Sequence, residues 1–503
     1  MIADIDESQN KDIELLSLNE LTKAVQKRLP VLQQRIKKSA IPVIIIFEGW
    51  GASGKGAIIG SLISELDPRG FKVYTTVAPS TDELRFPLIR RFWTKIPEYG
   101  RLSIFDRSWY RDVSISAVED GISNTQIERR FDDIVNIERQ LTDDGYVLLK
   151  FFLDISKKEQ RSRFEKLETN RATSWRVTKD DWKHHRMYAQ YKRAFEEMIK
   201  RTDRNYAPWI KINAKKRKKA CYDIFTCVES ALEDALRREK ASFSPFIKTD
   251  DSIKPLPTKG LSDYNPAVRF DNDEYKPALK RAQHRLFELH NVLYRRQIPL
   301  IIVYEGWDAA GKGGNIKRMT DGLDPRGYEV IPVAAPTSPE LYRHYLFRFW
   351  SSLPKSGHIA IYDRSWYGRV MVERIEKFCG EAQWKRAFDE INHFELSLSN
   401  WGAVIIKFWL HIDRDEQLFR FNERMNNEEK RWKITDEDWR NREKWELYEE
   451  AVDDMLIHTN TENAPWVVIE SNDKKHARVK AINNVIKRIE SVLKDRGIKS
   501  TLL

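Results

Sequence analysis

The segment Gly306–Gly313 reads GWDAAGKG and has the glycine and lysine spacing of a phosphate-binding loop. Glycines let a backbone wrap closely around an anion, and the N–H groups and the following helix N-terminus favour negative charge. The loop glycines are Gly306 and Gly311, and Lys312 follows, where its ammonium reaches a phosphate oxygen. Most such loops continue with a serine or threonine that binds magnesium, but this chain has Gly313. Magnesium therefore needs other ligands.

Two carboxylates are the candidate magnesium ligands. Asp308 lies inside the loop, and Asp363 ends the apolar run HIAIYD. A helix N-cap or an ion pair with Arg364 is an alternative role for Asp363. A carboxylate that ends a buried strand beside a phosphate loop favours the metal role. The sequence thus predicts a Mg²⁺ site at Asp308 and Asp363.

Cationic side chains around these motifs exceed what one nucleotide triphosphate needs. Each alone is typical of a solvated surface, but together they suit a track for a long phosphate chain, with arginine as a bidentate partner. The phosphate-binding candidates are Lys317, Arg318, Arg343, Arg424, Arg431 and Lys433. Arg364 and Arg369 are candidates to stabilise a transferring group. Glu373 is a candidate to hold a metal-bound water or a nearby arginine.

Short apolar runs and helix-like stretches alternate around these residues. The runs PLIIVYEG, YEVIPV, HIAIYD, AVIIKFWL and WVVIE are rich in β-branched and aromatic residues. This alternation predicts an α/β fold, a parallel sheet with helices on both faces. The charged, helical stretch at about 413–460 lies between the last two strands and is predicted to form a lid.

The sequence contains the same domain-sized unit twice in tandem. Gly306 lies 257 residues after Gly49, and DPRG and DRSWY recur at the same offset. A register held without a gap over so long a stretch indicates a tandem duplication of a whole domain. The predicted organisation is a degenerate domain at 15–240, a linker rich in Pro, Asp and Ser at 241–272, and an active domain at 273–503.

The first copy lacks several of the residues proposed for chemistry. Its loop keeps Lys55, but Gly51 stands where the second copy has Asp308. Lys317, Arg318, Arg343, Arg369 and Glu373 are replaced by Gly60, Ser61, Phe86, Asp112 and Ser116. We therefore expect a duplicated catalytic domain in which the first copy has lost its activity.

The composition narrows the class of protein. The chain has 503 residues, enough for two domains, and a formal charge of +11. That charge fits either general solubility or a polyanionic partner. No apolar run approaches the ~20 residues of a membrane helix, and the polar N-terminus does not predict a secretory signal. Three scattered cysteines fit neither a disulfide framework nor a zinc site, so a cytoplasmic setting is expected.

The motifs EGWDAAGKGG, DPRG, YDRSWYGRV, KRWKITDEDW and APW resemble those of the polyphosphate kinase 2 family. The resemblance covers nearly the whole chain and implies two tandem P-loop kinase-like domains with helical lids. It also implies magnesium-dependent transfer of a phosphoryl group between inorganic polyphosphate and a nucleotide. Two-domain members convert AMP to ADP, and the C-terminal domain is expected to be the active one. The residues assigned to catalysis are Asp308, Lys312, Asp363, Arg364, Arg369 and Glu373.

Three other functions remain open at this point. A polyphosphate-dependent kinase could accept ADP or GDP, because such acceptors differ by few pocket residues. A non-catalytic polyanion-binding protein would explain the charge but not the two carboxylates. An ATP-dependent nucleotide kinase would explain the loop but fits Gly313 and the excess of cations less well. Polyphosphate and AMP or ADP are the expected partners, with no membrane or nucleic acid and with a possible homo-oligomer.

Overall fold

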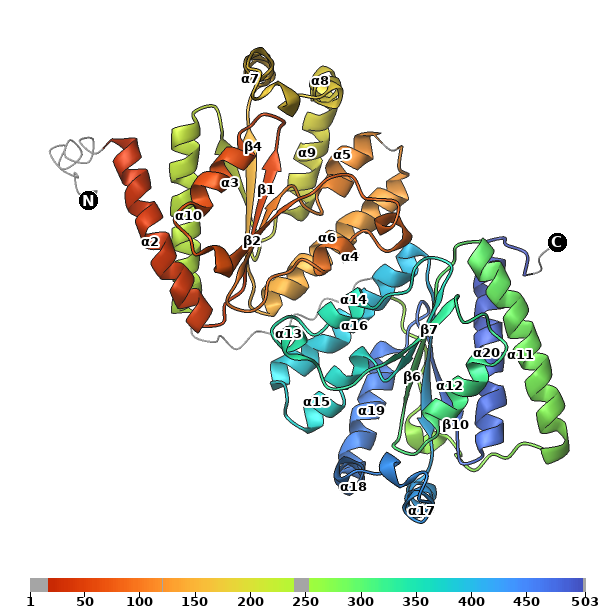
Figure 1. Ribbon diagram of the computed structural model, residues 1–503. Coiled ribbons are helices and arrows are strands. Elements are labelled where there is room, and N and C mark those ends of the chain that lie inside the picture. The colour runs from red at the N-terminus through yellow and green to blue at the C-terminus, as the bar shows by residue number, and fades with distance from the viewer. Residues whose placement is uncertain (1–16, 120, 239–252, 501–503) are drawn as a thin grey trace, which may run out of the picture. The chain divides into compact units, whose positions relative to one another are not determined.

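The computed structural model describes residues 17–119, 121–238 and 253–500, and Figure 1 shows their helices and strands. The described residues form two compact units, each built on one five-stranded parallel sheet. The α/β class with two tandem domains is therefore confirmed. The units comprise the described parts of Met1–Pro79, Arg91–Ser242 and Ser338–His344 for the first, and of Ser80–Arg90, Phe243–Thr337 and Tyr345–Leu503 for the second.

In the first unit, the central strand is the fully buried β1, and helices cover both faces of the sheet (Figure 1). The strand order is β2 (Phe71–Thr75), β3 (Leu102–Asp106), β1 (Val43–Gly49), β4 (Val147–Asp154) and β5 (Trp209–Asn213). One face carries α2 (Leu18–Lys38), α3 (Lys55–Ile63) and α10 (Arg217–Arg237). The other carries α5 (Arg111–Glu119), α6 (Asn124–Asp143) and α9 (Tyr188–Thr202), with α4 (Arg90–Trp93) nearby in the chain and the lid helices α7 (Lys157–Thr169) and α8 (Lys179–Arg186) beyond the sheet.

The second unit repeats this arrangement. Its strand order is β10 (Trp466–Glu470), β9 (Val404–His411), β6 (Leu300–Gly306), β8 (Ile359–Asp363) and β7 (Tyr328–Pro332). One face carries α11 (Asn272–Arg295), α12 (Lys312–Thr320) and α20 (Lys474–Asp495). Its other α-helices are α14 (Phe347–Ser351), α15 (Val372–Ile375), α16 (Glu381–Trp401), α17 (Arg414–Met425), α18 (Asp436–Glu443) and α19 (Trp445–Thr459), whereas α13 (Ser338–Leu341) belongs to the first unit.

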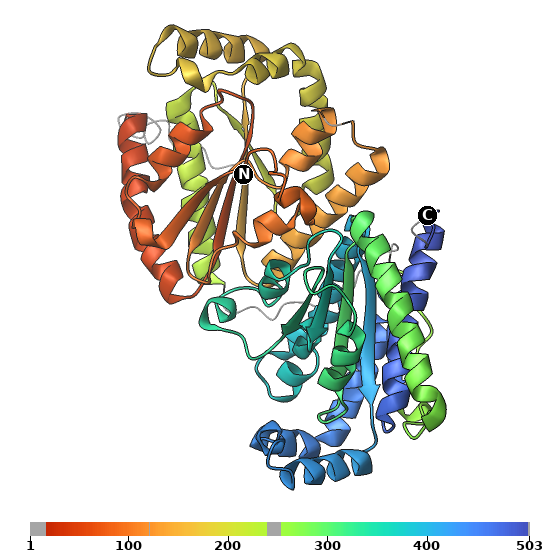
Figure 2. The same ribbon diagram turned by 45° about the vertical axis from the view of Figure 1, so that its right-hand side comes forward.

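The sheet brings the two predicted motifs to one place. Strands β6 and β8 are parallel neighbours, and Tyr304 pairs with Asp363 at their carboxyl ends. The loop after β6 and the carboxylate that ends β8 therefore emerge side by side, at the edge where open α/β sheets bind ligands. Helices α17 and α18 form the predicted lid beyond this edge, as Figure 2 shows.

A buried ion pair fixes the segment that carries Asp363. Lys407 of β9 is fully buried and its Nζ lies 2.7 Å from Glu395 Oε2, 2.7 Å from the Tyr367 hydroxyl and 2.7 Å from the Thr459 carbonyl oxygen. A buried charge needs such complete pairing, because an unsatisfied one costs several kcal/mol. The first unit has the same network around Lys150, made by Glu138, Tyr110 and Thr202.

The described part of the predicted linker packs against the second unit. The backbone N–H of Leu256 donates to the Asn460 carbonyl, and that of Leu261 donates to Asp453 Oδ1 at 2.8 Å. Leu261 is fully buried. Residues 253–272 are therefore part of a packed surface rather than a free connection. The first part of that linker, 241–252, lies outside the described residues.

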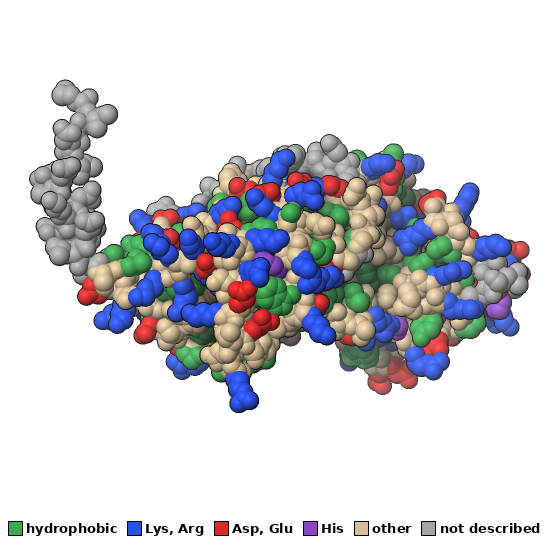
Figure 3. All heavy atoms as spheres, turned by 90° about the horizontal axis from the view of Figure 1, so that it is seen from above, with side chains coloured by type: hydrophobic (Ala, Val, Ile, Leu, Met, Phe, Trp, Pro, Cys, Tyr) green, Lys and Arg blue, Asp and Glu red, His purple; other side chains and the backbone are tan. Residues whose placement is uncertain are grey.

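The surface does not by itself reveal a binding face. On the face in Figure 3, lysine and arginine side chains are interspersed with aspartate and glutamate. Within the described residues, no helix has the length and apolar character needed to cross a membrane. The charges at the carboxyl edge of each sheet therefore say more about a binding site than the net charge does.

Candidate active site

The loop of the second unit has the backbone of an anion-binding loop. Gly306 has φ +149°, and a Cβ there would lie 2.6 Å from the Leu410 carbonyl oxygen, so no side chain fits. Gly311 has φ +102° and forms the N-cap of α12, which leaves the first N–H groups of that helix free to bind an anion. The loop, with Gly313 on the first turn of α12, lines an open cavity of about 360 Å³.

Lys312 closes back on its own loop. Its Nζ donates to the carbonyl oxygens of Gly306 at 2.7 Å and Trp307 at 3.3 Å. Burial lowers the pKa of the Lys312 ammonium, and the nearby charge of Arg364 adds to the effect. The ammonium thus sits at the cavity wall on weak carbonyl partners, which a phosphate oxygen can replace with a charge-assisted hydrogen bond.

Both predicted carboxylates line this cavity, in different states. Asp308 has a donor on each oxygen, because Arg364 Nη2 lies 3.1 Å from Oδ1 and Asn441 Nδ2 lies 2.9 Å from Oδ2. Asp363 has no hydrogen bond or ion pair from its carboxylate among the described residues. Arg364 therefore pairs with Asp308 rather than with Asp363, and Ser365, not Asp363, caps the following helical turn.

The two carboxylates fit a magnesium ion of the kind that phosphate enzymes hold. No cluster of three or more His, Cys, Asp or Glu side chains suited to a metal occurs in the part of the chain that the structure describes. Magnesium commonly binds one or two carboxylates and completes its shell with water and substrate phosphates. Asp363, whose carboxylate lies in the cavity without a hydrogen bond from the described residues, fits this pattern. Asp308 fits it if magnesium replaces its contact with Asn441 of the lid or with Arg364.

The structure brings together only part of the predicted cation track. Arg364, Arg424 and Lys433 line the cavity with the loop. Lys317 and Arg318 lie further along α12, and Arg431 lies in the lid turn before Lys433, outside the cavity lining.

Three predicted residues lie elsewhere. Arg343 belongs to the first unit, where its Nη2 lies 3.0 Å from Glu98 Oε1. Arg369 and Glu373 pair with each other at 2.8 Å, and the Arg369 guanidinium lies 4.4 Å from the centre of the Tyr345 ring. None of the three belongs to the residues that line the cavity. The charges of Arg343, Arg369 and Glu373 are thus paired within the protein.

Two buried residues that the sequence did not single out position the site. Glu305 accepts a hydrogen bond of 2.7 Å from the Ser365 hydroxyl, and burial raises the pKa of Glu305 to about 6. Arg420 of the lid helix α17 is only 2% exposed. Its Nη1 donates to the carbonyl oxygens of Ala309 and Ala310, and its Nη2 donates to those of Ser471 and Asn472.

Comparison of the two copies offers a signal for Arg420. Its counterpart Arg163 survives in the first copy, although neighbouring cations of the lid are lost, and it binds the carbonyls of Ala52 and Ser53 in the same way. A cation kept where catalytic residues have gone indicates a structural role. Arg420 therefore holds the shape of the loop rather than a substrate.

We expect Arg420→Ala to destabilise the second unit. The change leaves four carbonyl groups and the Glu416 carboxylate without their buried partner, a loss of about 3–5 kcal/mol. The midpoint of thermal unfolding should fall by several degrees, whereas Arg424→Ala, which alters an arginine at the open cavity, should leave it unchanged. Equal midpoints for the two variants would contradict this assignment.

The first unit keeps the loop but not the site. Lys55 Nζ donates to the carbonyls of Gly49 and Trp50, as Lys312 does to its own loop, and burial lowers the pKa of Lys55 to about 8. A cavity of about 20 Å³ lies at this loop and is lined by Gly49, Trp50 and Gly51 but not by Lys55. A Cβ at Gly51 would lie 3.4 Å from Asp181 Oδ1 and 3.4 Å from the Phe164 ring, so the lid lies in contact distance of this loop position.

The lid contact is also lost in that copy. His184 stands where the second copy has Asn441, and its Nε2 lies 2.5 Å from Glu119 Oε1, away from the loop. Asp112, which replaces Arg369, is buried. No magnesium carboxylate pair equivalent to Asp308 and Asp363 therefore exists in the first unit, because Gly51 provides no ligand.

Known proteins are similar to this chain in sequence and in fold. The chain is 40% identical to a polyphosphate:AMP phosphotransferase of Pseudomonas aeruginosa, covering 98% of this chain and 99% of that protein. It is 33% identical to one of Acinetobacter johnsonii, covering 93% and 95%. A solved structure of a polyphosphate kinase 2 from Pseudomonas aeruginosa superposes with a TM-score of 0.82 at 38% identity, over 95% of this chain and 96% of that one.

The family model polyphosphate kinase 2 matches both units. It covers residues 16–240 and again residues 269–497, so each copy is recognised over its whole sheet and lid. The chain belongs to the polyphosphate kinase 2 family.

Proposed function

We propose that the second unit transfers the terminal phosphoryl group of inorganic polyphosphate to AMP, giving ADP. The observation that carries this proposal is the open cavity in which Lys312, Asp308 and Asp363 meet Arg364, Arg424 and Lys433. Relatives of full length are named polyphosphate:AMP phosphotransferases. Relatives that match about half of the chain are named for NDP, GDP or ADP, so AMP is the preferred acceptor.

The reaction exchanges one phosphoanhydride for another. An oxygen of the AMP phosphate attacks the terminal phosphorus of the chain, the P–O bond to the next phosphate breaks, and the shortened chain leaves with that oxygen. The two bonds are of one type, so the reaction is reversible and concentrations set its direction. Catalysis then consists of alignment and of stabilising charge on the phosphoryl oxygens.

The residues of the cavity supply those two effects. Lys312 and the free N–H groups of α12 bind the phosphate, and Arg364 stabilises the transferring group. Asp363 would hold magnesium, directly or through water, and Asp308 would join it or orient the acceptor. Bound magnesium would neutralise charge on the phosphate oxygens. No serine, cysteine or histidine nucleophile lines the cavity, so transfer is direct.

The setting we propose is the cytoplasm, where AMP is present. The described cysteines are all free thiols, which accords with a reducing compartment. A homo-oligomer is compatible with a duplicated unit that descends from a self-associating one.

The test is an acceptor screen with the purified full chain, polyphosphate and no ATP. ADP formed from AMP supports the proposal, and GTP or ATP formed faster from GDP or ADP would move the acceptor to a diphosphate. Tight polyphosphate binding without turnover of any acceptor would instead support a binding protein. Magnesium should be saturating for every acceptor.

Salt should separate the two substrates. A polyanion that replaces its counterions with Arg424, Lys433 and the loop loses affinity steeply with ionic strength, by analogy with nucleic acids. We expect the KM for long-chain polyphosphate to rise at least about tenfold between 50 and 200 mM salt. The KM for AMP, which carries one phosphate, should change far less. The same salt dependence for both substrates would contradict an extended cationic path.

A further inference from the structure

One cation beside the loop has no role in the site described so far. Arg478 lies on α20, and its Nη2 would be 3.7 Å from a Cβ built on Gly314, in the first turn of α12. Among the described residues its side chain has one hydrogen bond, a long one of 3.3 Å to the Tyr275 hydroxyl, and no carboxylate partner. A partly buried guanidinium without a counter-ion is suited to an anionic ligand.

The two helices are locked together at this point. Asn315 is buried on α12, where its Nδ2 donates to the Ala477 carbonyl of α20 at 3.0 Å and its Oδ1 accepts from the Tyr304 hydroxyl at 2.9 Å. This contact lies next to both Gly314 and Arg478 in the chain. The packing of the two helices therefore holds the backbone of Arg478 at a fixed place beside the start of α12.

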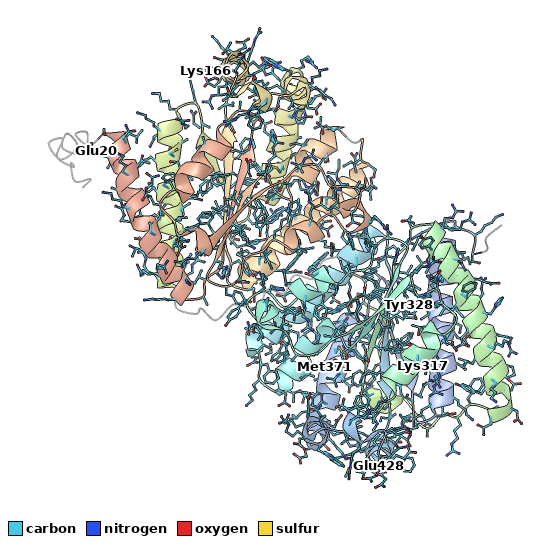
Figure 4. The ribbon with its side chains drawn as sticks, in the orientation of Figure 1. Glu20, Lys166, Lys317, Tyr328, Met371 and Glu428 are labelled. Atoms are coloured by element: carbon cyan, nitrogen blue, oxygen red, sulfur yellow. The ribbon has the colours of Figure 1, made fainter. Side chains whose placement is uncertain are left out.

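A row of cations continues from Gly314 along α12. Residues three and four apart lie on one face of a helix, so Lys317 and Arg318 follow Gly314 one turn later. Figure 4 shows Lys317 on α12, on the face of the sheet that α11 and α20 also cover in Figure 1. Gly314 is also the third residue of α12, and its N–H is one of those left free at a helix start. Arg478 thus joins the loop donors to Lys317 and Arg318.

The first copy has lost this row as a set. Gly60, Ser61 and Cys221 stand where the second copy has Lys317, Arg318 and Arg478. By contrast, Arg217 stands at the position of Lys474, at the start of the same helix, so the basic character of that helix start is kept. Other cations of α20 are also replaced, Lys480 by Asp223 and Arg488 by Ala231, but Arg478 is the one that lies beside Gly314 of the phosphate loop helix.

We propose that Arg478, together with Lys317 and Arg318, binds the part of the polyphosphate chain that extends beyond the phosphate loop. This inference rests on the proposed function. It adds the direction in which the polyphosphate chain leaves the loop, over the surface where α12 and α20 meet. The lid cations Arg424 and Lys433 lie at the cavity itself. The distal phosphates therefore contact the sheet's helical layer, and the phosphates nearest the reaction contact the loop and lid.

The three cations of this row are accompanied by one carboxylate at the end of α12, that of Asp321, which lies three residues after Arg318. Glu416 and Glu423 act on the pKa of Lys474, which burial lowers, but neither has a hydrogen bond or ion pair with Arg478 in the described part of the chain. The row thus presents a net positive surface next to the loop. A phosphate chain, with one negative charge per phosphate, is the ligand chemistry that matches such a row.

The test compares variants of the full-length protein in direct binding of fluorescently end-labelled long-chain polyphosphate. Arg478→Gln should weaken binding about tenfold and reduce the slope of affinity against salt by about one. Arg478→Lys should keep most of the affinity. Lys487→Gln, on an exposed position of the same helix, and Tyr275→Phe, which removes the hydrogen bond to Arg478, should bind like the wild type.

Kinetics give the second readout. For Arg478→Gln we expect a higher KM for long chains, with kcat, the KM for AMP and the KM for tripolyphosphate unchanged, because a short chain is held by the loop and lid and does not reach Arg478. Wild-type affinity and salt slope in Arg478→Gln would overturn the inference and leave the proposed function intact. A wild-type protein that neither binds polyphosphate nor forms ADP would overturn both.

Discussion

Lys312→Ala is expected to lower the rate of ADP formation by ~10²–10³, whereas Lys55→Ala should keep most of the rate. Removing one fixed positive charge from a transferring phosphoryl group costs roughly 3–4 kcal/mol of transition-state stabilisation. The two lysines make the same loop contacts, so a motif search would give them equal roles. They differ in their surroundings, since Lys312 lines a cavity of about 360 Å³, whereas the cavity of about 20 Å³ at the loop of the first unit is lined by Gly49, Trp50 and Gly51 and not by Lys55.

The pair should be assayed side by side with AMP and polyphosphate at saturating magnesium. Each variant serves as the folding control of the other, because both remove an ammonium from two carbonyl partners in equivalent loops. Thermal unfolding of each should be compared with the wild type. Equal losses of turnover in both variants would establish two working sites and contradict the inactive first copy.

Asp363→Asn is expected to raise the magnesium concentration for half-maximal activity by about 10–100-fold, or to abolish activity. The carboxylate of Asp363 has no protein partner within the described residues, so the change removes a metal ligand without breaking a structural contact. Asp308→Asn is a less specific probe, because Asp308 also holds Arg364 and Asn441.

Magnesium titrations of activity should be run on Asp363→Asn and on the surface control Asp321→Asn. The unfolding temperature of Asp363→Asn without magnesium should equal that of the wild type. Magnesium should then stabilise the wild type in the presence of a phosphate ligand more than it stabilises the variant. A wild-type magnesium titration in Asp363→Asn would place the metal site elsewhere.

Local spacing explains why the loop and its carboxylates could be predicted from the sequence. The glycines, Lys312 and Asp308 lie within eight consecutive residues, and Asp363 follows an apolar run whose neighbour in the sheet is set by the parallel fold. The offset between the copies then identified Gly51 as a loss. These inferences need strand order and helix starts but no side-chain contact.

Contacts between distant residues could not be predicted in the same way. Arg343 pairs with Glu98, which lies far away in the sequence, and only the folded structure reveals that its charge is taken. Arg420 looks like any lid cation until its four carbonyl partners are seen. Arg369 and Glu373 are only four residues apart, so an ion pair between them was one of the two roles that the sequence left open for Glu373.

The lid of the first unit bears on the history of the duplication. Asp181 and Phe164, the lid residues beside Gly51, have the same residue types as Asp438 and Phe421 in the second unit, so these positions were kept when the loop aspartate was lost. His184, by contrast, stands where the second unit has Asn441, and it pairs with Glu119 instead of a loop carboxylate. Restoring aspartate at position 51 would therefore return a carboxylate without its amide donor, and recovery of the first site requires at least paired changes at positions 51 and 184. A lost activity in a duplicated domain becomes harder to regain with each partner residue that changes after it.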